Sequence, residues 1–199
     1  KDGSIVVADG NSVVEICGVK ELLIPGPHNL ENALAAAAMA YFAGIGAESI
    51  ARTLRTFRGV AHRIERCGEK NGVFFVNDSK GTNPDAAIKG IQAMNRPTLL
   101  IGGGYDKQST YEEWIQAFDG KVRFLVLIGD TKEKIAKAAR SVGFNDIIMA
   151  DNLKEAVQIC HDKANAGDAV LLSPACASWD QFKSYEQRGE LFKEYVRAL

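Results

Sequence analysis

The chain has 199 residues, enough for one large or two small domains, of which 46% are hydrophobic and 25% are charged. That composition allows a sizeable buried core and excludes wholesale disorder. The 24 basic and 25 acidic residues nearly cancel, so the net charge of −1 gives no reason to expect nucleic acid or an anionic membrane as the main partner.

The cysteines and histidines give no sign of a metal site or of a disulfide framework. The four cysteines form no C-x-x-C pair, and the three histidines lie far apart in the sequence. There is no signal-like start and no run of about 18 apolar residues. We therefore expect a soluble, cytoplasmic protein with reduced thiols. We also expect a monomer, and no metal ligands in this chain. Because Lys1 is not a natural start, we expect a processed chain or the later part of a longer protein.

The first 24 residues predict short strands. Three apolar runs lie at Ser4–Ala8, Ser12–Cys17 and Leu22–Ile24. Asp9-Gly10-Asn11 between the first two predicts a hairpin turn.

Two helices are expected next. Pro25-Gly26-Pro27 breaks any regular element, and His28–Gly44 and Ala47–Phe57 then show helical patterns. The first of these is rich in alanine, so it should pack closely under a sheet. Strands and helices of this size bury too little surface to fold confidently alone. Residues 1–58 are therefore interpreted as the last part of a larger domain.

From residue 59 onward the pattern becomes regular. Five apolar runs predict strands at Val73–Val76, Thr98–Ile101, Phe124–Ile128, Ile147–Met149 and Ala169–Leu172. Helical stretches follow them near Pro84–Met94, Thr110–Phe118, Thr131–Val142, Leu153–Ala164 and Asp180–Arg197. Alternating strands and helices of this kind predict an α/β fold of roughly 140 residues, with a mostly parallel open sheet in an αβα sandwich.

The loops after these strands should converge, because ligands bind beyond the carboxyl ends of parallel strands. The polar or small segments that follow strands are Asn77–Asn83, Gly102–Lys107, Gly129–Thr131 and Ser173–Asp180. The run Gly102–Gly104 is either a place where a ligand approaches the backbone or a flexible turn. The sequence contains neither G-x-G-x-x-G nor G-x-x-x-x-G-K-[ST].

Several single residues leave two interpretations open. Ser178 is either a hydroxyl donor to a ligand or, like Asp180, the cap of the last helix. Cys176 is expected to be a small buried residue. His62–Glu65 is either a solvated charged stretch or a place from which Arg63 clamps a phosphate or ribose.

Asn29 and Asn32, spaced i and i+3 at a helix start, could contact a purine or simply cap the helix.

Taken together, these motifs resemble the Mur ligase family, the ATP-dependent amino acid ligases of peptidoglycan precursor synthesis. The matching segments are Gly26–Asn32, Phe57–Gly59, His62–Glu65, Asn77–Asn83, Leu172–Phe182 and Glu186–Gly189. The Asn77–Asn83 and Leu172–Phe182 blocks are most similar to the branch that adds D-glutamate to UDP-N-acetylmuramoyl-L-alanine.

The resemblance implies roles for residues of this chain. Asn32, Arg63 and Asp78 would contact the nucleotide, and Lys80 would be the catalytic residue near the phosphates. D-Glutamate would be held by Thr82, Lys107, Ser178 and the backbone near Tyr185. ATP and Mg²⁺ would take part, bound mainly by other domains. Gly81 stands where the family often has alanine, a difference expected to be harmless.

The resemblance also implies a division of the chain. Residues 1–58 would end the central ATP-binding domain, and residues 59–199 would form the carboxyl-terminal domain. Two alternatives remain open at this point. One is a sister amide ligase with another amino acid substrate, and the other is a non-catalytic αβα ligand-binding module.

Overall fold

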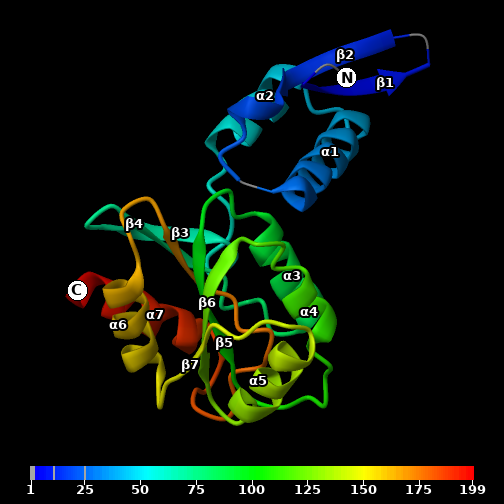
Figure 1. Ribbon diagram of the computed structural model, residues 1–199. Coiled ribbons are helices and arrows are strands. Elements are labelled where there is room, and N and C mark those ends of the chain that lie inside the picture. The colour runs from blue at the N-terminus through cyan, green and yellow to red at the C-terminus, as the bar shows by residue number, and fades with distance from the viewer. Residues whose placement is uncertain (1–2, 11, 25) are drawn as a thin grey trace. The chain divides into compact units, whose positions relative to one another are not determined.

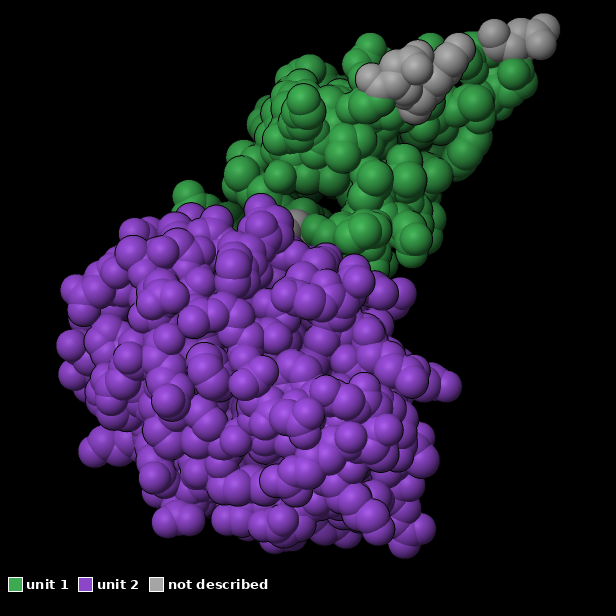
Figure 2. All heavy atoms as spheres, viewed as in Figure 1, with its two compact units in different colours: residues 1–59 green, residues 60–199 purple. Residues whose placement is uncertain are grey.

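The computed structural model describes residues 3–10, 12–24 and 26–199. The chain forms two compact units, residues 1–59 and residues 60–199 (Figure 2). Each unit has a hydrophobic core of its own, and the two are described separately.

The first unit begins with the predicted hairpin. Strands β1 (Ser4–Asp9) and β2 (Ser12–Gly18) pair antiparallel, and Asn11 of the turn lies outside the described residues. A short 3-10 helix, η1 (Val19–Glu21), follows. The predicted strand at Leu22–Ile24 is wrong, because the backbone N–H of Leu22 closes the 3-10 turn on the Val19 carbonyl instead of pairing with a strand.

Two helices complete this unit, α1 (Pro27–Phe42) and α2 (Ala47–Thr56). They confirm the predicted helices to within two residues at each end. Pro25 of the predicted break lies outside the described residues, and Pro27 is the first helical residue of α1. Ala33 and Ala37 are buried in the same cluster as the apolar side of the hairpin, so the alanine-rich helix does pack on the strands. It does so along one narrow stripe, since Ala35 and Ala36 are exposed.

The second unit is built on a six-stranded sheet. Its strands are β3 (Glu65–Lys70), β4 (Val73–Asn77), β5 (Thr98–Gly103), β6 (Val122–Ile128), β7 (Ile147–Met149) and β8 (Ala169–Leu172). Their order across the sheet is β3-β4-β8-β5-β6-β7. All neighbouring pairs are parallel except β3 with β4. The five predicted strands and the mostly parallel sheet are confirmed.

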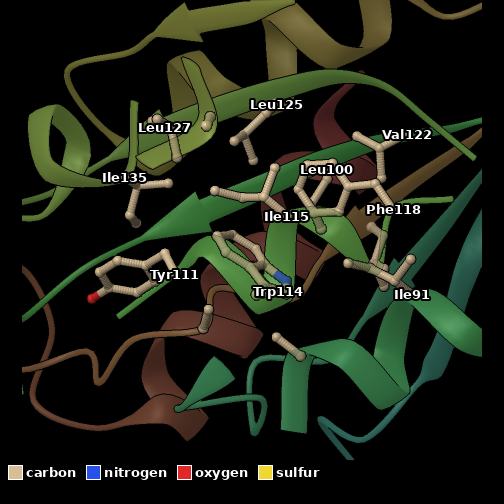
Figure 3. Close-up of a cluster of buried hydrophobic side chains, with 14 of the residues drawn as sticks. Ile91, Leu100, Tyr111, Trp114, Ile115, Phe118, Val122, Leu125, Leu127 and Ile135 are labelled. Atoms are coloured by element: carbon tan, nitrogen blue, oxygen red, sulfur yellow. The ribbon is translucent and has the colours of Figure 1, made fainter. Parts of the chain in front are cut away.

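Helices cover both faces of this sheet, as predicted (Figure 1). One face carries α3 (Pro84–Gln92), α4 (Glu112–Gln116) and α5 (Lys132–Ser141), and the other carries α6 (Leu153–Lys163) and α7 (Tyr185–Ala198). Successive residues of a strand point to opposite faces. Leu100 therefore packs with Trp114 and Ile135 in one cluster (Figure 3), whereas Leu99 packs with Phe192 in the other.

The last helix begins later than predicted. Its N-cap is Ser184, whose side chain accepts a hydrogen bond from the backbone N–H of Gln187. The capping roles considered for Ser178 and Asp180 are therefore wrong. The intervening residues remain in an irregular loop at the edge of the sheet.

The position of β8 sets the directions in which neighbouring loops leave the sheet. The chain leaves β4 and β5 toward the face that carries α3 and α4, but it leaves β8, which lies between them, toward α7 on the opposite face. Neighbouring strands whose loops diverge in this way leave a crevice beyond their carboxyl ends. Within the described ranges, no helix is long and apolar enough to cross a membrane.

Candidate functional site

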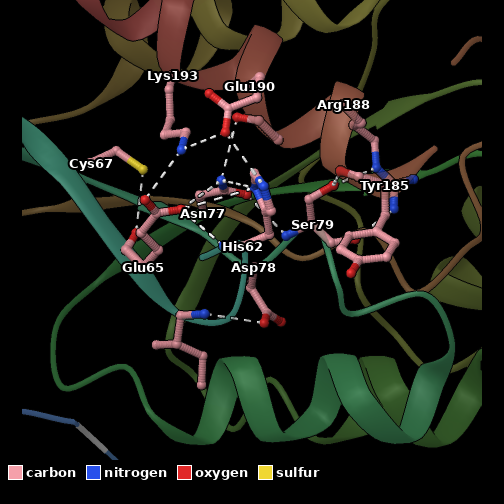
Figure 4. Close-up of polar contacts among 12 residues, drawn as sticks. His62, Glu65, Cys67, Asn77, Asp78, Ser79, Tyr185, Arg188, Glu190 and Lys193 are labelled. Carbon is pink, nitrogen blue, oxygen red and sulfur yellow. Dashed lines mark hydrogen bonds and ion pairs between the residues drawn. The ribbon is translucent and has the colours of Figure 1, made fainter. Parts of the chain in front are cut away.

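The loop after β4 starts from a buried asparagine (Figure 4). Asn77 is fully buried, and its Oδ1 accepts a hydrogen bond from the Ser79 backbone N–H at 3.0 Å. That bond fixes the amide orientation, so Nδ2 is the group that faces His62 Nδ1 at 3.0 Å and the Gly189 carbonyl at 3.3 Å. His62 Nδ1 is thus an acceptor, and Nε2, which carries a ring proton, lies 3.5 Å from Glu190 Oε1.

Asp78 points to the other side of the loop, toward α3 (Figure 4). Its carboxylate is 4% exposed and accepts hydrogen bonds from Ser173 Oγ at 2.7 Å and from the Ile64 backbone N–H at 3.3 Å. Burial raises the pKa of Asp78 to about 6, although these hydrogen bonds and the charges of Arg63 and Arg188 act in the opposite direction.

Two glycines leave room for this carboxylate. A Cβ atom at Gly90 of α3, or at Gly81 of the loop, would lie 2.7 Å from Asp78 Oδ2. The glycine at position 81, expected to be a harmless difference from alanine, leaves space that the Asp78 and Ser173 side chains occupy, so an alanine there would require both to move.

Arg188, on α7, is fully buried and joins two loops. Its Nε donates to Ser79 Oγ at 2.9 Å and its Nη2 to the Ser79 carbonyl at 2.8 Å. On the other side, Nη1 and Nη2 both donate to the Cys176 carbonyl, and Nη1 also donates to the Ala177 carbonyl. Burial lowers the pKa of Arg188 to about 10, a value at which the side chain is still a cation at neutral pH.

Two predicted lysines lie at the rim of this edge. Lys80 Nζ donates to the Tyr185 hydroxyl at 3.2 Å and lies 5.0 Å from the centre of that ring. Lys107 Nζ donates to the Thr82 carbonyl at 3.4 Å and lies 5.4 Å from the centre of the Trp179 ring. Among the residues that the structure describes, neither lysine forms an ion pair with a carboxylate. Cations without carboxylate partners favour an anionic ligand.

The loops after β5 and β8 are bonded to each other. The Tyr105 backbone N–H donates to the Ala177 carbonyl at 2.9 Å, and the Tyr105 and Trp179 rings lie 5.5 Å apart. Cys176 is buried, as predicted, and its Sγ lies 3.2 Å from the Tyr111 hydroxyl.

The Gly102–Gly104 run serves this packing. A Cβ atom at Gly103 would overlap the Ile128 carbonyl, and one at Gly104 would overlap the Ala177 carbonyl. These glycines allow strands and loops to approach each other. Neither a flexible turn nor an opening for a ligand is needed to explain them.

The structure brings most of the predicted site residues to one edge of the second unit. Lys80 contacts Tyr185, and Lys107 contacts Thr82, as described above. Ser178 is buried in the β8 loop, where its carbonyl accepts a hydrogen bond from the Phe182 backbone N–H at 2.8 Å.

The residues predicted to bind the nucleotide are placed differently. Asp78 is enclosed behind Gly81 and Gly90. Arg63 is exposed, between His62 and Ile64, which both have positive φ. Asn32 belongs to the first unit, where it is exposed on α1. Asn29 next to it is buried, so the two amides do not share a surface. The nucleotide role stays a prediction for all three residues.

Sequence reasoning missed the residues that hold the loops, namely His62, Asn77, Ser79, Arg188 and Gly189. A signal was present in α7. Arg188, Phe192 and Val196 recur at intervals of four, so an arginine occupies a position of the buried stripe. A glycine inside a helix, as at Gly189, also points to a close approach. A Cβ atom there would overlap His62 Nδ1.

The described residues contain no group of three or more His, Cys, Asp or Glu side chains suited to hold a metal ion. The donors at this edge are ammonium groups, hydroxyls and backbone N–H groups. They fit phosphate or carboxylate oxygens and do not fit Mg²⁺.

Residues 62–176 match the family model described as Mur ligase, glutamate ligase domain. The chain is 54% identical over its whole length to UDP-N-acetylmuramoylalanine–D-glutamate ligase from Thermoanaerobacter sp. (strain X514), of which it covers 44%. It is 52% identical to the enzyme of the same name from Lachnoclostridium phytofermentans, again covering 44%.

A solved structure of UDP-N-acetylmuramate–alanine ligase from Thermotoga maritima aligns with 98% of the chain, covering 42% of that protein. The TM-score is 0.72 at 19% identity, which shows a shared fold. The chain thus spans less than half the length of the curated relatives it matches. On the match of its second unit to the family model, the chain belongs to the Mur ligase family.

Proposed function

We propose that this chain is the carboxyl-terminal part of an ATP-dependent ligase that adds D-glutamate to UDP-N-acetylmuramoyl-L-alanine. Residues 1–58 would end the central ATP-binding domain, and residues 59–199 would form the carboxyl-terminal domain of a cytoplasmic, monomeric enzyme. The observation that carries the proposal is the pair of lysines, Lys80 and Lys107, which reach one edge from two loops without a carboxylate partner in the described part of the chain. The 54% identity to a D-glutamate ligase supports the choice of substrate.

D-Glutamate has two carboxylates, so its site needs donors at two ends. Lys107 and the hydroxyl groups of Thr82 and Ser178 belong to three loops that meet at this edge, and they would hold the side-chain and α-carboxylates. The backbone at Tyr185 would close the site, because its carbonyl is already tied to the β4 loop through Ser79 Oγ at 2.8 Å.

The reaction that this part serves would proceed in two steps. The terminal carboxylate of UDP-N-acetylmuramoyl-L-alanine attacks the γ-phosphorus of ATP, ADP leaves, and an acyl phosphate forms. The amine of D-glutamate then attacks the acyl carbon, and the tetrahedral intermediate expels phosphate to leave an amide. Lys80 would stabilise the negative charge of the transferred phosphoryl group. This chain would orient the amine and exclude water as the enzyme closes over ATP.

The nucleotide side of the site would use Arg63, Asp78 and Asn32. Arg63 is an exposed cation and fits a phosphate. Asp78 would act through its ordering of the Ile64 backbone or after a movement of Gly81, since its carboxylate is enclosed. Mg²⁺, which offsets phosphate charge in such transfers, finds no cluster of ligands among the described residues.

A titration of the chain with D-glutamate, followed by amide chemical shifts, tests the proposal. We expect shifts at Thr82, Lys107 and Ser178, smaller shifts with L-glutamate, and a loss of the response in Lys107→Met. Lys121→Met, which removes a half-buried lysine just before the amino end of β6, away from the loops at the carboxyl ends of the strands, is the control. Equal responses to D- and L-glutamate, or to an amino acid without a second carboxylate, would contradict the choice of substrate.

We also propose that the 199-residue chain does not ligate by itself. Its sequence contains no phosphate loop of the G-x-x-x-x-G-K-[ST] type to hold the ATP phosphates. The purified chain, supplied with ATP, magnesium, D-glutamate and UDP-N-acetylmuramoyl-L-alanine, should release no phosphate above background. Coupled product detected by mass spectrometry would overturn this statement.

A further inference from the structure

Arg188 is the one arginine among the described residues that is buried completely, and the hydrogen bonds of its guanidinium go to two loops far apart in sequence. Ser79 of the β4 loop accepts two of them, through Oγ and its carbonyl. The carbonyls of Cys176 and Ala177 in the β8 loop accept the others. The side chain therefore joins the β4 loop to the β8 loop, and each of its three nitrogens donates at least one hydrogen bond.

These acceptors are sequence neighbours of the predicted ligand residues. Ser79 precedes Lys80, and Ala177 precedes Ser178. Ser79 Oγ, which accepts from Arg188, donates in turn to the carbonyl of Tyr185. A movement of the guanidinium would therefore displace Lys80, Ser178 and the Tyr185 backbone together. Each of these lies one residue or one hydrogen bond from an atom that accepts from Arg188.

The loop after β5 is hydrogen-bonded to one of the same carbonyl groups. The Ala177 carbonyl that accepts from Arg188 Nη1 also accepts from the Tyr105 backbone N–H. Gly104 packs so closely here that a Cβ atom on it would lie 3.4 Å from Arg188 Nη1. Lys107 follows two residues after Tyr105, so its loop is fixed to the same group.

The charge of Arg188 is not neutralised by a contacting carboxylate. All of its hydrogen-bond partners are carbonyl or hydroxyl oxygens, and among the described residues it forms no ion pair. Burying a cation is costly, and a well-packed apolar side chain often gives equal or greater stability at such a position. The carboxylates of Asp78 and Asp180 act on this charge without contacting it, and the guanidinium adds positive potential to the loops that it joins.

We propose that Arg188 is a positioning residue of the D-glutamate site. Its guanidinium holds the β4 and β8 loops to each other, and its charge, which no carboxylate of the described residues contacts, favours a dicarboxylate ligand at their rim. The role in ligand binding rests on the proposed function, whereas the locking of the loops does not.

Hydrogen exchange of the whole chain tests the lock. The reporters are the amides of Ser79 and Tyr105, which donate to Asn77 Oδ1 and to the Ala177 carbonyl. In Arg188→Lys and Arg188→Gln, exchange should accelerate about tenfold or more at both reporters together. The Thr98 amide, in the core of the sheet, should not change. Arg197→Gln, which removes an exposed arginine from the same helix, is the matched control and should leave all three unchanged.

D-Glutamate titration separates the lock from the charge. Arg188→Lys keeps the charge but cannot span both loops, so its affinity should fall about tenfold, and Arg188→Gln should lose more because it also lacks the charge. If the wild-type chain does not bind D-glutamate, the proposed function fails, and the exchange experiment alone decides the lock.

The proposal is overturned if the two reporters exchange as in the wild type, or if only one of them responds. The proposal is also overturned if the Thr98 amide accelerates as much as the two reporters, because that result indicates general destabilisation. Should Arg188→Gln fail to fold, Ser79→Ala removes the Nε acceptor and leaves the arginine in place. It should accelerate the Tyr105 amide, which Ser79 does not contact, and an unchanged Tyr105 amide would contradict the coupling.

Discussion

Asp78 is a residue whose ionised form the fold opposes. In unfolded chains an aspartate has a pKa of about 3.9, whereas burial raises the pKa of Asp78 in the folded state to about 6. The folded protein therefore holds the proton more tightly than the unfolded chain. The stabilisation from neutral Asp78 is complete below about pH 4 and is lost as the pH rises through about 6. Above that pH, the buried carboxylate remains as a destabilising charge.

Asp78→Asn should remove this dependence on pH. The amide keeps an acceptor for the Ile64 N–H and can face Ser173 Oγ, but it cannot ionise. Relative to wild type, the free energy of unfolding should rise by up to about 3 kcal/mol at pH 7.5 and by about zero near pH 4. Urea unfolding across this range measures the difference. The exposed Asp146→Asn is the control, and a gain that is constant with pH would contradict the assignment.

At Gly189, helix propensity and packing predict opposite effects of an alanine substitution on stability. Alanine inside a helix is ordinarily more favourable than glycine by about 1 kcal/mol. In α7, however, a Cβ atom would overlap His62 Nδ1 and lie 2.9 Å from Asn77 Nδ2. Gly189→Ala should therefore destabilise the chain by about 1–3 kcal/mol in thermal unfolding. Glu194→Ala, exposed on the same helix, should be close to neutral, and a stabilised Gly189→Ala would refute the steric account.

At the scale of elements, two helices begin in nearly the same way but in different places. Asn83 caps α3 by accepting from the Ala86 N–H at 2.9 Å, and Asn152 caps α6 by accepting from the Glu155 N–H at 3.0 Å. Only Asn83 belongs to the candidate site, since it directly follows Thr82.

Replacing either asparagine with alanine should cost about 1 kcal/mol of stability, because each change removes one cap. Asn83→Ala alone should also accelerate exchange of the Thr82 amide, which donates to the Lys80 carbonyl, and weaken D-glutamate binding. Calorimetry, exchange and titration of the two variants give the comparison. If Asn152→Ala weakens binding as much, the effect comes from general stability and not from the loop.

The strands that could be predicted from the sequence are those whose own residues form an apolar run typical of burial. Strands β4, β5, β6 and β8 are covered on both faces, so each appears as a continuous apolar run. Strand β3 was missed because it is an edge strand with the sequence ERCGEK, and charged side chains protect such edges from pairing with other chains. The order of the strands in the sheet could not be predicted either, because no local sequence pattern shows that β8 inserts between β4 and β5.

The candidate site was predictable to the extent that topology dictates it. Parallel strands place their following loops at one edge, and this rule alone predicted that Lys80, Lys107 and Ser178 would converge. The residues that fix these loops could not be predicted, because they act through contacts between positions about 100 residues apart, such as that of Arg188 with Ser79. A buried arginine on a helix looks like any charged helical residue until its neighbours are known.

At the scale of the whole molecule, the two units should unfold separately. The first has a small core, and most of the large exposed hydrophobic side chains belong to it, among them Leu34, Met39, Phe42 and Ile45. The second has two clusters that pack against both faces of a sheet. Less burial gives less stability, so the first unit should open at lower denaturant concentration.

Limited trypsin digestion measures this difference. Arg58 is exposed between α2 and β3, so brief treatment should yield a resistant fragment that begins near residue 59. Amides of β1 and β2 should exchange faster than those of β5 and β6. A single unfolding transition, with equal protection in both units, would show that they are one cooperative structure.

The insertion of β8 between β4 and β5 also sets the order in which the protein can be made. A ribosome releases β4 and β5 before β6 and β7, yet the strand that separates them is the last of the sheet to emerge. Until residues 169–172 leave the exit tunnel, β4 has no parallel neighbour, and the side of β5 that pairs with β8 is open. Nascent chains of this domain therefore carry an unfinished sheet from the emergence of β5 until that of β8, and the central gap closes only with the last strand.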